Sequence, residues 1–63
     1  MTPTEVKQAA DEMVEVFGPY MAIEHCKRVI EVLEKCHALN DGFVLAQLNT
    51  HRLILSELEG RVK

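Results

Sequence analysis

The fold is decided by residues 20–39, which read YMAIEHCKRVIEVLEKCHAL. In an α-helix, with about 100° of rotation per residue, the apolar side chains of this segment cover an arc of about 200°. They are Met21, Ala22, Ile23, Cys26, Val29, Ile30, Val32, Leu33, Cys36 and Leu39, with His37 inside the same arc. A helix on the surface of a globular domain usually has an apolar stripe little wider than about 100°. We therefore expect this helix to be covered twice, by its own chain and by a second copy.

The chain before this segment predicts a first helix and a tight turn. Thr2 and Glu5 have the spacing of a capping box, and the proline between them is tolerated in a first turn. Apolar residues then recur at intervals of three and four, which is helical spacing, over residues 3–17. Gly18 ends this helix because glycine adopts the left-handed conformation that stops one, and the proline after it suits the start of the next. The second helix is expected over residues 19–39.

A second break, Asn40-Asp41-Gly42, separates the second helix from a third. Asparagine and glycine tolerate a positive φ, and an Asn or Asp side chain can cap the helix that follows. We place the third helix at residues 42–59, because Gly60 weakens the last turn. Its apolar seam has intervals of four and three residues, as in a heptad pattern. The seam consists of Val44, Leu48, His51, Leu55, Leu58 and Val62.

These features predict an all-α fold in a single domain, residues 1–63. Short connections favour antiparallel or steeply crossed neighbours, so we expect a three-helix bundle, or a helical hairpin plus a short N-terminal helix. A chain of 63 residues is close to the lower limit at which one core stabilises itself without a disulfide, a metal or a partner. Self-association buries the apolar side that one copy leaves exposed. We therefore expect a homo-oligomer, with a homodimer as its smallest form.

The charge pattern argues against nucleic acid as a partner. Ten acidic residues oppose seven basic ones, for a net charge of −3. Duplex binding requires Lys and Arg clustered on one face, whereas the basic residues here are spread along the chain. The acidic first helix is interpreted as a solvated face, with docking on a basic partner as the alternative. The sequence shows no secretory leader and no apolar run of about 18 residues, so we expect a cytoplasmic protein without a membrane span.

Two dipeptides, His25-Cys26 and Cys36-His37, resemble pairs of metal ligands. In one continuous helix the two cysteines lie about 15 Å apart along the axis. That is too far for a disulfide, whose Cα atoms lie within about 7 Å, or for ligating one zinc ion. We interpret both as small buried hydrophobic residues, with a disulfide or metal joining two copies as the alternative. His37 and His51 lie in apolar seams, where we expect half-buried, hydrogen-bonded rings, or alternatively a pH-sensitive interface.

Sequence motifs for catalysis or cofactor binding are absent. The three glycines are isolated from one another, so there is no glycine-rich phosphate loop. The single serine, Ser56, is not part of a nucleophile elbow. We therefore predict no enzyme activity, no cofactor and no metal site.

The sequence favours a non-catalytic helical module for protein–protein interaction or regulation. It would form a homo-oligomer through surplus apolar surface on the middle and last helices, and a further protein partner is compatible with this. The predicted interaction residues are Ile23, Ile30, His37, Leu45 and Leu53. The alternative is a small DNA-binding regulator of the helix-turn-helix type, because three helices with tight turns can form that motif. The third-helix residues that could contact bases are Gln47, Asn49, Thr50 and Arg52.

Overall fold

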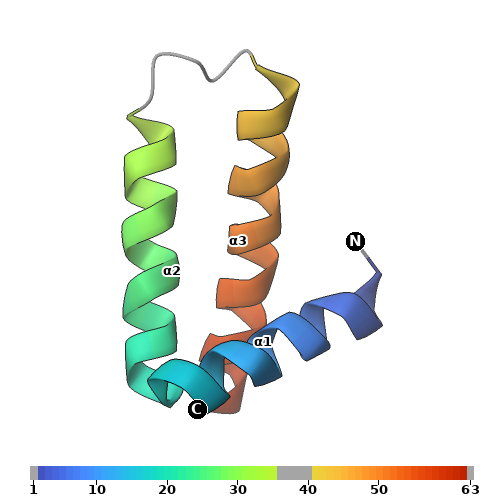
Figure 1. Ribbon diagram of the computed structural model, residues 1–63, viewed down its shortest axis with the longest axis vertical. Coiled ribbons are helices and arrows are strands. Elements are labelled where there is room, and N and C mark those ends of the chain that lie inside the picture. Colours follow the sequence, from blue (N-terminus) through green and yellow to red (C-terminus); the bar gives the residue numbers. More distant parts are fainter. Residues whose placement is uncertain (1, 36–40, 63) are drawn as a thin grey trace.

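The computed structural model describes residues 2–35 and 41–62 and confirms an all-α fold (Figure 1). The three helices are α1 (Pro3–Phe17), α2 (Pro19–Glu34) and α3 (Gly42–Arg61). α2 and α3 run antiparallel as a hairpin (Figure 1). We call the end formed by the start of α2 and the end of α3 the near end, and the opposite end the far end.

The predicted caps form at the starts of α1 and α3. The Thr2 hydroxyl accepts a hydrogen bond from the Glu5 amide at 3.2 Å, and the Glu5 carboxylate accepts one from the Thr2 amide at 3.2 Å. This is the reciprocal capping box. At α3, the carboxylate of Asp41 accepts a hydrogen bond from the amide of Phe43 at 2.8 Å. Each cap satisfies amide groups that have no partner inside the helix.

A single residue, Gly18, joins α1 to α2. Its φ of 82° lies in the region that favours glycine. Its amide donates to the Val14 carbonyl at 2.8 Å, and its own carbonyl accepts from the Ala22 amide at 3.0 Å. Gly18 thus completes the last turn of one helix and the first turn of the next.

Two helix ends differ from the sequence-based expectation. α2 ends at Glu34, with Lys35 as its C-cap, whereas the sequence predicted a helix over residues 19–39. Residues 36–39 of that prediction lie outside the described residues. α3 continues to Arg61, two residues beyond the expected end at residue 59. Gly60 is helical, and Arg61 after it forms ion pairs with Glu57 and with Asp11 of α1, as described below. Local sequence spacing does not predict the pair with Asp11.

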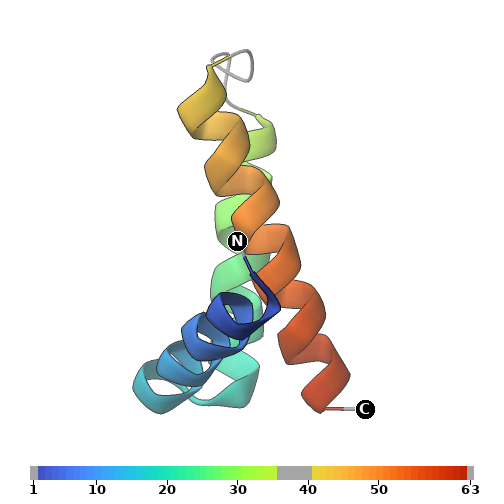
Figure 2. The same cartoon turned by 90° about the vertical axis from the view of Figure 1, so that its right-hand side faces the viewer.

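α1 lies across one face of the hairpin at its near end (Figures 1 and 2). The core forms where the three helices meet. It consists of Val6, Ala10, Ala22, Ile23, Cys26, Ile54 and Leu58, with Ala9, Met13, Val14 and Leu55 packed against it. All these residues belong to α1, to the first half of α2 or to the second half of α3. The far half of the hairpin therefore lies outside this three-helix core.

Small side chains and one arginine hold α1 in place. Ala10, Ala22 and Cys26 are completely buried, and the Cys26 sulfur lies 3.9 Å from the Met13 sulfur. Small residues at a helix crossing allow the two backbones to approach closely. At the edge of the contact, the Arg61 guanidinium pairs with Asp11 at 2.7 Å and with Glu57 at 3.2 Å. α1 is thus fixed by close packing and by a charged contact to the end of α3.

We expect Thr2→Ala to lower the free energy of unfolding by about 1 kcal/mol, because it removes one half of the capping box. Chemical denaturation followed by circular dichroism measures this loss. Thr4→Ala is the matched control, since Thr4 is exposed in the same turn but does not cap the helix.

The same capping box sets a pH dependence. Hydrogen bonds from the Thr2 amide and hydroxyl lower the pKa of Glu5 below its ordinary value. The ionised carboxylate therefore stabilises the fold above that ordinary pKa, and the contribution disappears as the pH falls through the lowered value. Glu5→Gln keeps an acceptor for the Thr2 amide but carries no charge, so the stability difference between wild type and Glu5→Gln should shrink on acidification. A pH-independent difference would contradict a contribution from the ionised carboxylate.

Candidate interaction surface

One side of α3 faces α1 at the near end and continues uncovered toward the far end. Ile54 and Leu58 mark this side because they lie in the core with α1. Thr50, Gln47 and Phe43 precede Ile54 by four, seven and eleven residues, intervals that return to the same side of a helix. These three residues therefore extend the α1-facing side of α3 beyond the reach of α1.

The same extension occurs on α2. Cys26 marks the side of α2 that faces α1, through its contact with Met13. Val29 and Leu33 follow Cys26 by three and seven residues, intervals that return to the same side of a helix. Val29 and Leu33 therefore extend the α1-facing side of α2 toward the far end, whereas Val32, six residues after Cys26, lies about 120° away around the helix.

These two sets form one surface, which we call the open hairpin face: Val29, Leu33, Phe43, Gln47 and Thr50. Phe43 is 72% exposed, and the other four residues are half-buried. None of the five carries a charge, although 27% of the chain is charged. In both views α1 stays at the near end and does not cover this part of the hairpin (Figures 1 and 2). The open hairpin face has the composition of a protein interface.

The structure places the predicted interaction residues at different depths. Ile23 is only 7% exposed and belongs to the chain's own core, so it is not available to a partner. Ile30 follows it by seven residues and is half-buried. Leu45 and Leu53 are 46% and 49% exposed on α3. His37 lies outside the described residues.

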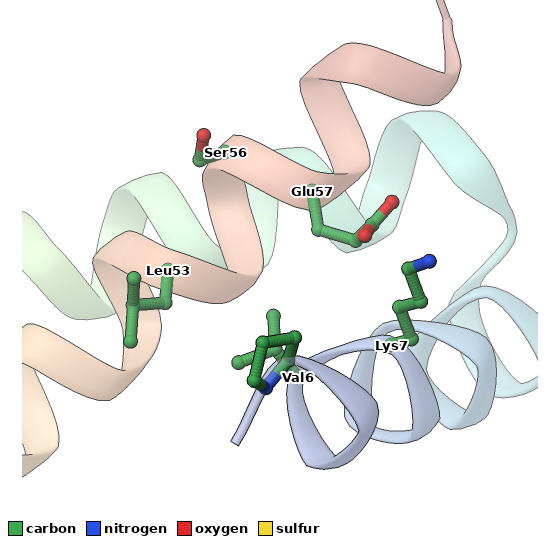
Figure 3. Close-up of a pocket in the computed structure, with 6 residues that line it drawn as sticks. Val6, Lys7, Leu53, Ser56 and Glu57 are labelled. Carbon is green, nitrogen blue, oxygen red and sulfur yellow. The ribbon is translucent and has the colours of Figure 1, made fainter. Parts of the chain in front are cut away.

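Leu53 lines a shallow groove of about 290 Å³ between α1 and α3. Its walls are formed by Pro3, Val6, Lys7, Leu53, Ser56 and Glu57. Figure 3 shows Leu53 at one end of the groove and the charged Lys7 and Glu57 at the other. Leu53 thus lies beside α1 and remains accessible from solvent.

A third apolar area surrounds the turn between α1 and α2. Its exposed residues are Val16, Phe17, Tyr20 and Met21. The Phe17 ring stacks on His25, with ring centroids 5.0 Å apart. The adjoining cleft of about 450 Å³ is rimmed by charges from Glu24, Lys27, Arg28 and Glu31. This mixture of charge and apolar surface distinguishes the turn from the uncharged open hairpin face.

Cys26 and the seam histidine His51 serve structural roles. Cys26 is buried, as predicted, and burial raises the pKa of its thiol, which favours the unreactive protonated form. The His51 ring is half-buried and its Nδ1 lies 2.7 Å from the Gln47 carbonyl oxygen, in agreement with the expected seam histidine. Cys36 lies outside the described residues. Within residues 2–35 and 41–62, no three His, Cys, Asp or Glu side chains converge as metal ligands.

The polar residues of α3 do not form one stripe. Gln47 and Thr50 are half-buried on the open hairpin face. Arg52 lies on another side, where its guanidinium pairs with the Glu34 carboxylate of α2 at 3.1 Å. Asn49 is exposed, two residues away from Gln47 and therefore on a different side. A recognition helix presents such residues along a single face.

Comparisons of the chain with family models, with curated proteins and with solved structures give no match. None of the helices in the described ranges is both long enough and apolar enough to cross a membrane. The functional argument therefore depends on the geometry of this chain alone.

We expect Cys26 to resist alkylation in the native protein and to react when the chain is unfolded in denaturant, because its thiol is buried and protonated. Peptide mapping by mass spectrometry follows Cys26 separately from Cys36. Equal labelling of Cys26 in the native and the unfolded protein would show that the core is not closed around it.

Proposed function

We propose that this chain is a small non-catalytic helical module for protein–protein interaction or regulation, which self-associates through the open hairpin face. One observation carries the proposal: the uncharged open hairpin face continues the core beyond α1 and includes Phe43, which is 72% exposed. An uncovered apolar surface that is continuous with the core favours an interface, whereas single exposed apolar residues need no explanation.

We expect Phe43→Glu to reduce the assembled form to a single chain, because an unpaired carboxylate is strongly unfavourable in an apolar interface. Light scattering over about a hundredfold range of protein concentration measures the mass, since self-association depends on concentration. Circular dichroism verifies that the variant is folded, which we expect because the Phe43 side chain is 72% exposed.

Tyr20→Glu is the matched control for that variant. It introduces the same carboxylate at an aromatic residue that is 74% exposed and is also the second residue of its helix, but lies at the near end, away from the open hairpin face. Tyr20→Glu should retain the mass of the wild type. A wild type that has the mass of one chain at every concentration would exclude self-association.

DNA binding was the alternative from the sequence, and the scattered polar residues of α3 give it no support. With a net charge of −3, the chain should not bind random duplex DNA, even at low salt, because it has too few clustered cations to displace counterions. Fluorescence anisotropy with a labelled duplex measures this. Salt-dependent binding in that assay would favour the DNA-binding alternative over the interaction module.

A further inference from the structure

We draw no further inference here: the strongest candidate, the open hairpin face on the far half of α2 and α3, is an unpartnered apolar surface that already carries the proposed function, and nothing in the structure shows what covers it.

Discussion

The junction at Gly18 determines where the third helix can lie. Only this residue separates α1 from α2, and its amide and carbonyl are both used in helical hydrogen bonds. α1 therefore has to begin its contact with the hairpin beside the start of α2. A helix of 15 residues is about 22 Å long, and it crosses the hairpin at an angle instead of running along it. The far half of the hairpin consequently has no third helix from its own chain.

The packing of the core reflects this position. Alanine and cysteine side chains line the contact of α1 with α2, and Arg61 connects α1 to the end of α3 through Asp11. These contacts hold α1 at the near end. The far half depends on the contact between α2 and α3 alone. Leu48 is buried there, and the other apolar side chains are half-buried or exposed. A short chain thus has one well-closed half and one half that gains stability from further burial.

The proposed interaction surface is a consequence of the same asymmetry. The groove beside Leu53 and the turn around Phe17 are apolar areas with charged residues at their edges. The open hairpin face differs because it is uncharged and continuous with the core. An area of that kind is covered by a partner more favourably than by water.

The sequence by itself determined the helices and their surplus of apolar surface, because both are local. The caps at Thr2 and Asp41 act over two or three residues, and the wide apolar arc of the middle segment is a matter of helical spacing. The tertiary structure alone decided which apolar residues remain uncovered. Ile23 was expected at an interface and is buried, whereas Phe43, outside the predicted seam, is exposed. The difference arises from where α1 crosses the hairpin, and that crossing depends on contacts between residues far apart in the chain, such as Asp11 with Arg61.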